Sequence, residues 1–101
     1  MTEPDATTGP MAFTATFPPE ERYAATAGEI AGRLATACGC TSAAADDVRD
    51  AVSKAFGVAV GSAASSGAAV DVTVRAEGAA FEADLACGGR ALLHCSKPRP
   101  A

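Results

Sequence analysis

The sequence is poor in large side chains. It has no tryptophan, one tyrosine and four phenylalanines in 101 residues, and alanine inflates the hydrophobic fraction of 49%. Because burial of apolar surface contributes roughly 25 cal/mol per Å², a core of small side chains has a weak driving force. We therefore expect a single modest domain of marginal stability that gains from association with a partner.

The sequence also lacks clustered positive charge and long apolar runs. The net charge is −4, and the eight Lys and Arg residues are scattered apart from Lys97 and Arg99. Nucleic-acid binding needs clustered cations, and a membrane-spanning helix needs about 20 apolar residues. The N-terminal residues MTEPDATTGP are acidic and polar, unlike a secretion signal. These features predict a cytoplasmic protein that binds neither nucleic acid nor membrane.

Cysteine occurs four times, at Cys38, Cys40, Cys87 and Cys95, and His94 is the only histidine. In a reducing compartment we expect free thiols. Structural zinc sites usually use cysteines separated by two to four residues, whereas this chain has Cys-Gly-Cys and an adjacent His-Cys pair. We therefore predict no metal, and a cysteine-based metal-binding or redox module is only a third hypothesis.

The clearest pattern in the chain is a helical stripe over Ser42–Ala63. Spacings of three and four residues place its apolar side chains on one face. Those side chains are Val48, Val52, Ala55, Phe56, Ala59, Val60 and Ala63. Asp46, Asp47 and Asp50 are interpreted as partners of the positive end of the helix dipole rather than as metal ligands.

Before this helix, the sequence predicts a disordered tail over residues 1–10, a strand over Met11–Phe17 and a helix from Pro19 to Gly39. The apolar stripe expected for that helix contains Tyr23, Ala27, Ile30, Leu34 and Cys38. Gly28 and Gly32 are interpreted as tolerated glycines that weaken the helix by about 1 kcal/mol each. The alternative is that they let another backbone come close.

After the second helix, alternation over Val70–Val74 and Phe81–Cys87 predicts a hairpin that turns at Glu77 and Gly78. Residues 90–95 fit either a helical turn or a strand, and residues 96–101 are expected to fray. The domain should therefore span residues 11–95 in the order strand-helix-helix-strand-strand. This order predicts an α+β two-layer sandwich with both helices on one face of a small, mostly antiparallel sheet.

This order and these residues resemble the histidine kinase-like (GHKL) ATPase domain, in the branch of anti-sigma factors and serine-protein kinases. FPPEERYAATAGEIAGRLATACG resembles the family's first strand end and first helix, and DDVRDAVSKAFGVAVGSA resembles its second helix. VDVTVRAEGAAFEADLACGG falls where the family has the strand pair before its first glycine box.

The resemblance implies three polar roles, and this sequence departs from all of them. The family's catalytic glutamate and magnesium-binding asparagine fall on Lys54 and Val58, which lack the required oxygens. The aspartate that reads adenine falls on Cys87, or on Ala86 if the register shifts by one. The retained glycine is Gly89 or Gly88. No counterpart of the ATP lid or the second glycine box follows Ala91.

We therefore expect a non-catalytic regulatory module that binds a protein and needs no cofactor. The resemblance implies contacts through the first helix, with Arg22, Glu29 and Arg33 as polar contacts and a sigma factor or an anti-sigma antagonist as partner. The alternative is an ATP-binding protein of the same superfamily that keeps a reduced nucleotide pocket. The uncharged edge strand at residues 12–17 also suggests a homodimer.

Overall fold

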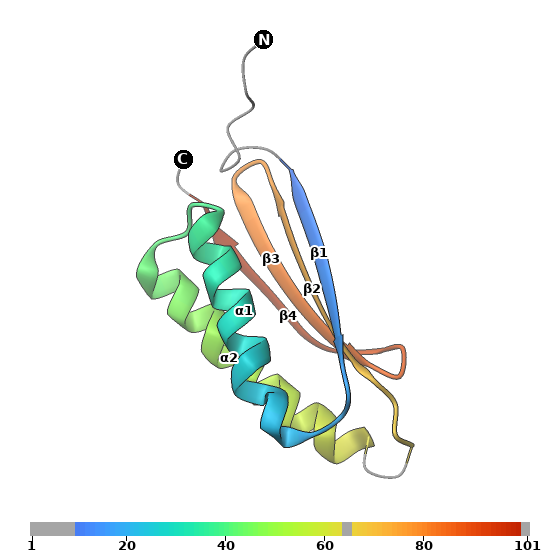
Figure 1. The fold of residues 1–101 in the computed structure, drawn as a ribbon. Helices are drawn as coiled ribbons and strands as arrows, with labels where there is room; N and C mark the ends of the chain where they lie inside the picture. The colour runs from blue at the N-terminus through green and yellow to red at the C-terminus, as the bar shows by residue number, and fades with distance from the viewer. Residues whose placement is uncertain (1–9, 64–65, 100–101) are drawn as a thin grey trace.

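The computed structural model describes residues 10–63 and 66–99. Two helices cover one face of a four-stranded antiparallel sheet, so the predicted α+β sandwich is confirmed (Figure 1). Of the tail predicted at residues 1–10, only Pro10 lies within the described residues, and it is exposed outside any helix or strand. No helix in the described ranges is long and apolar enough to cross a bilayer.

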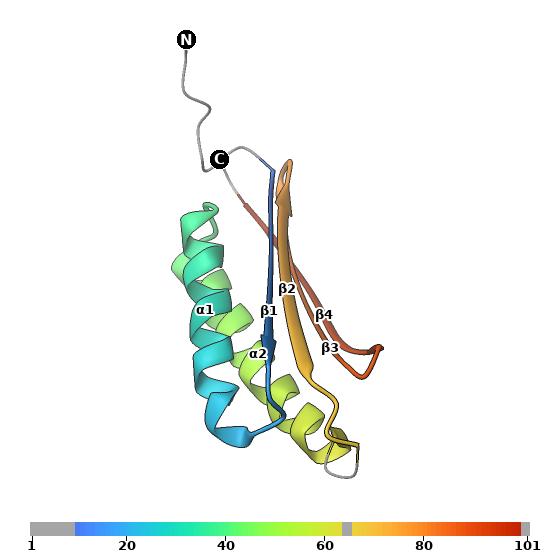
Figure 2. The ribbon, with the colours of Figure 1, turned by 45° about the vertical axis from the view of Figure 1, so that its right-hand side comes forward.

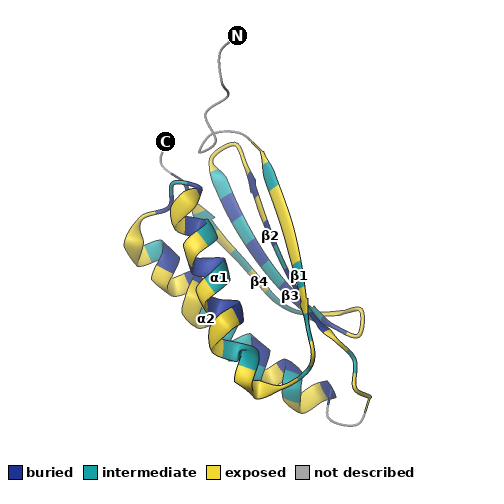
Figure 3. Ribbon diagram, in the orientation of Figure 1, coloured by how far each residue is buried: buried dark blue, intermediate teal, exposed yellow. Residues whose placement is uncertain are grey.

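The sheet has the spatial order β1-β2-β3-β4, and every neighbouring pair is antiparallel. The strands are β1 (Met11–Phe17), β2 (Val70–Glu77), β3 (Ala80–Cys87) and β4 (Arg90–Pro98). The predicted hairpin is confirmed as β2 and β3, and Gly78 adopts a φ of 60° in its turn. Alternate residues of both strands are buried against the helices, whereas the residues between them face away (Figure 3).

The last strand, β4, resolves one open question and corrects one prediction. Residues 90–95 are strand, not a helical turn. The predicted fraying is wrong for residues 96–99, because residues 96–98 continue β4 and Arg99 is buried. The Arg99 backbone N–H donates to the Ala79 carbonyl oxygen at 2.8 Å, and Arg99 Nε donates to the Gly78 oxygen at 2.9 Å. Residues 100–101 lie outside the described part of the chain.

The helix α2 spans Ser42–Ala63, which are the predicted bounds. Thr41 precedes it, and the Thr41 hydroxyl accepts a hydrogen bond from the Ala44 backbone N–H at 3.1 Å, as an N-cap does. The predicted stripe is buried at Val48, Val52, Phe56, Ala59 and Ala63. Ala55 and Val60 are half-buried at the margins of this stripe.

The first helix begins later than predicted. A 3₁₀ turn, η1, occupies Glu21–Tyr23, and α1 spans Ala24–Ala37. The predicted stop at Gly39 is confirmed, since Gly39 has a φ of 98°. The Gly39 and Cys40 backbone N–H groups donate to the Thr36 and Ala35 oxygens, each at 3.0 Å. This pair of bonds is a Schellman motif, which satisfies the last carbonyl groups of the helix.

The predicted stripe of α1 is only partly correct. Ala27 and Cys38 are buried, and Tyr23 and Leu34 are half-buried against the core, but Ile30 does not pack against it. Four further residues of α1 are buried: Gly28, Ala31, Gly32 and Ala35. A methyl group added to Gly28 would lie 2.6 Å from the Arg49 carbonyl oxygen of α2, and one added to Gly32 would lie 3.3 Å from the Ala45 oxygen. The two glycines therefore admit the backbone of α2, so the interpretation as merely tolerated glycines is also wrong.

Candidate functional site

Of the three predicted partner-contact residues, Arg22 lies in η1, whereas Glu29 and Arg33 lie four residues apart on one side of α1. Arg33 has 80% of its side chain exposed, and Arg33 Nε lies 2.8 Å from Glu29 Oε2. Arg22 Nε lies 2.9 Å from Glu20 Oε1, and the Arg22 guanidinium lies 4.9 Å from the Tyr23 ring centroid. The charges are accessible and are held in place by neighbours on the same segment.

A shallow hollow on α1 lies beside these charges. It has a volume of about 430 Å³ and is lined by Ala25, Thr26, Glu29, Ile30 and Arg33. Ile30 is half-buried, although the sequence predicted it as core. The surface of α1 therefore combines small apolar side chains with one exposed ion pair.

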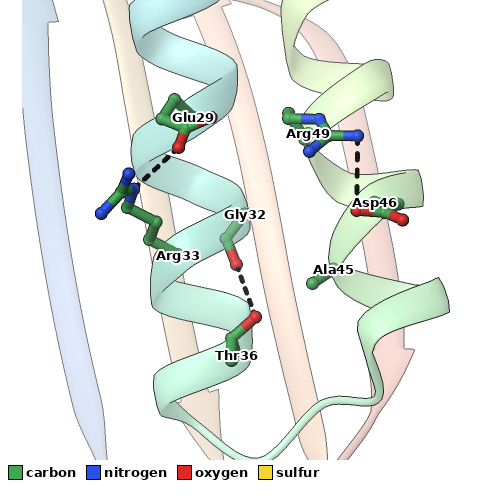
Figure 4. Close-up of a pocket in the computed structure, with 7 residues that line it drawn as sticks. All are labelled: Glu29, Gly32, Arg33, Thr36, Ala45, Asp46 and Arg49. Atoms are coloured by element: carbon green, nitrogen blue, oxygen red, sulfur yellow. Dashed lines mark hydrogen bonds and ion pairs between the residues drawn. The ribbon is translucent and has the colours of Figure 1, made fainter.

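A narrower groove runs between α1 and α2 (Figure 4). Its volume is about 120 Å³, below the roughly 300 to 1,000 Å³ of typical ligand pockets. Arg49 of α2 pairs with Asp46 at 3.3 Å, and Glu29 of α1 pairs with Arg33. Each carboxylate of the groove thus has an arginine from its own helix. The groove is a seam between closely packed helices rather than a pocket of nucleotide size.

The acids near the start of α2 were predicted to act on the helix dipole, but none lies in its first turn. Instead they form ion pairs. Besides the Asp46 pair, Asp50 lies 3.7 Å from Arg49, and Asp47 lies 3.2 Å from Lys97 of β4. The Asp47–Lys97 pair links the helix layer to the last strand. The sequence analysis missed this pair because its two members are fifty residues apart.

The positions that the resemblance assigns to an ATP site lie on α2, at the end of β3 and in the turn after it. Lys54 and Val58 are exposed on α2, and Val58 has 61% of its surface accessible. Cys87 ends β3 beneath the same helix, with its thiol 3.9 Å from the Ala59 oxygen. Gly89 is exposed in the turn before β4, with a φ of 79°. The side chains at these four positions are one ammonium group, one isopropyl group and one thiol, with none at Gly89, so they provide no oxygen ligand.

Of the alternative positions for the glycine box, Ala86 is half-buried and Gly88 is exposed. Successive strand residues point to opposite faces, so Ala86 faces away from α2. Neither position adds an oxygen ligand. Neither the groove between the helices nor the hollow on α1 includes any of these residues in its lining.

The soft side chains do not converge. Cys38 and Cys40 follow α1 at one end of the sandwich, whereas Cys87 ends β3 at the other (Figure 1). His94 and Cys95 are adjacent in β4 and therefore point to opposite faces. In the part of the chain that the structure describes, no three His, Cys, Asp or Glu side chains form a group that could hold a metal.

All four thiols are free, as predicted. Cys38 and Cys87 are buried in the core, where cysteine packs as a small hydrophobic residue. Burial raises the pKa of the Cys40 thiol, and nearby Cys38 raises it further, while Arg99 acts in the opposite direction. A raised pKa favours the protonated thiol, so Cys40 is poorly suited to act as a nucleophile.

The sheet face opposite the helices carries a polar network that the sequence analysis did not identify. Arg75 of β2 contacts Glu82 at 2.8 Å and Asp84 at 3.5 Å on β3. Asp84 also contacts Nδ1 of His94, whose side chain is exposed. On β1, Thr16 donates to Asp71 at 2.8 Å. The alternating polar residues of the strands could have predicted a polar face of the sheet. Only the register between the strands shows which of these residues contact one another.

Comparison of the sequence with protein-family models and with curated proteins finds no match.

Proposed function

We propose that this chain is a non-catalytic protein-binding module of the cytoplasm, related to the anti-sigma branch of the histidine kinase-like ATPases. The supporting observation is the surface of α1, where a hollow lined by Ala25 and Ile30 adjoins the exposed Glu29–Arg33 ion pair. Protein interfaces commonly combine an apolar centre with a polar rim. The resemblance names a sigma factor or an anti-sigma antagonist as the partner.

A role without phosphate chemistry fits the side chains at the ATP-site positions. Lys54 cannot serve as a carboxylate base, and Val58 has no atom for a magnesium ion. Both project from the exposed side of α2. The chemistry proposed for this chain is therefore binding alone.

The proposal is tested by titrating the chain with a purified sigma factor, and separately with an anti-sigma antagonist, encoded beside its gene. We expect saturable binding to one of them and at least a tenfold weaker affinity for Arg33→Glu, because that change places two acids side by side on α1. Arg90→Glu is the control, since Arg90 is exposed at the start of β4, away from α1 in the sequence. Equal affinities for the two variants would contradict the assignment to α1.

The second candidate function is ATP binding in a reduced pocket, which the family resemblance implies. A calorimetric titration with ATP and magnesium separates the two functions. A protein-binding module gives no saturable heat, whereas micromolar binding would favour the nucleotide-binding alternative.

The proposal includes self-association. β1 is an edge strand without a charged residue, and its free side lies at the margin of the sheet (Figure 2). An exposed edge of this kind can pair with a strand from another chain.

A further inference from the structure

We draw no further inference here: the strongest candidate, the apolar surface patch on the helix-facing side of β1 where Phe13 is 42% exposed, carries none, because nothing in the structure shows what covers it.

Discussion

At the residue scale, the absence of a side chain determines how the two helices meet. Gly28 and Gly32 are one helical turn apart, and both face Arg49 of α2. Ser53 of α2 adds a hydrogen bond to the Ala24 carbonyl oxygen at 3.2 Å. Close approach of the backbones thus replaces the interlocking of large side chains that this sequence does not supply.

We predict opposite effects for two glycine-to-alanine substitutions. Gly28→Ala should lower the free energy of unfolding by about 1 to 3 kcal/mol, because its methyl group would overlap the Arg49 carbonyl oxygen. Gly61→Ala should raise it by up to about 1 kcal/mol, because Gly61 is exposed in α2 with open space around it. Urea denaturation measures both. Equal stabilisation by the two changes would show that the helices do not approach this closely.

At the element scale, β4 depends on contacts at its end. Arg99 is 4% exposed, and its guanidinium donates to the Gly78 carbonyl oxygen in the turn between β2 and β3. Lys97, two residues earlier, pairs with Asp47 of α2. The last strand is therefore attached both to its own sheet and to the helix layer.

We predict that Arg99→Ala lowers the free energy of unfolding by about 1 to 3 kcal/mol, since it removes a buried side chain and its part-buried hydrogen bond to Gly78. Amide exchange in β4 should accelerate more than exchange in β2. Arg90→Ala serves as control, because Arg90 is exposed at the start of the same strand. Unchanged exchange in β4 of Arg99→Ala would show that the strand is held without this contact.

At the scale of the whole molecule, a few larger side chains hold an alanine-rich core together. Phe56, Phe81 and Leu85 are the largest fully buried side chains. Phe56 also packs edge-to-face on Phe17 at the end of β1, with 5.6 Å between ring centroids. Phe56 therefore joins α2 to the end of the strand that we propose as the dimer edge.

We predict that Phe56→Ala lowers the free energy of unfolding by about 3 to 5 kcal/mol, a large part of the stability of a small domain. Val58→Ala, two residues away on the exposed side of α2, should change it by less than about 0.5 kcal/mol. Thermal and urea unfolding followed by circular dichroism compare the two. A small effect for Phe56→Ala would mean that the core is not organised around this ring.

The sequence predicted the helices and strands whose hydrophobic pattern lies entirely within one continuous segment of the chain. The bounds of α2, the strand β1 and the β2–β3 hairpin follow from residues that alternate or recur at helical spacing. It also determined that the side chains of Lys54 and Val58 carry no oxygen atoms. These properties belong to a single segment or a single side chain, so no knowledge of distant residues is needed.

Only the tertiary structure decided which face of α1 is buried, that residues 96–98 extend β4 and that Arg99 is buried. Hydrophobic periodicity favoured Ile30 and Leu34, but the approach of α2 buried the glycine face instead. The contacts of Arg99 with Gly78 and of Lys97 with Asp47 join residues 21 and 50 positions apart. Such pairs form only when the chain folds and brings distant residues together, so no local sequence pattern predicts them.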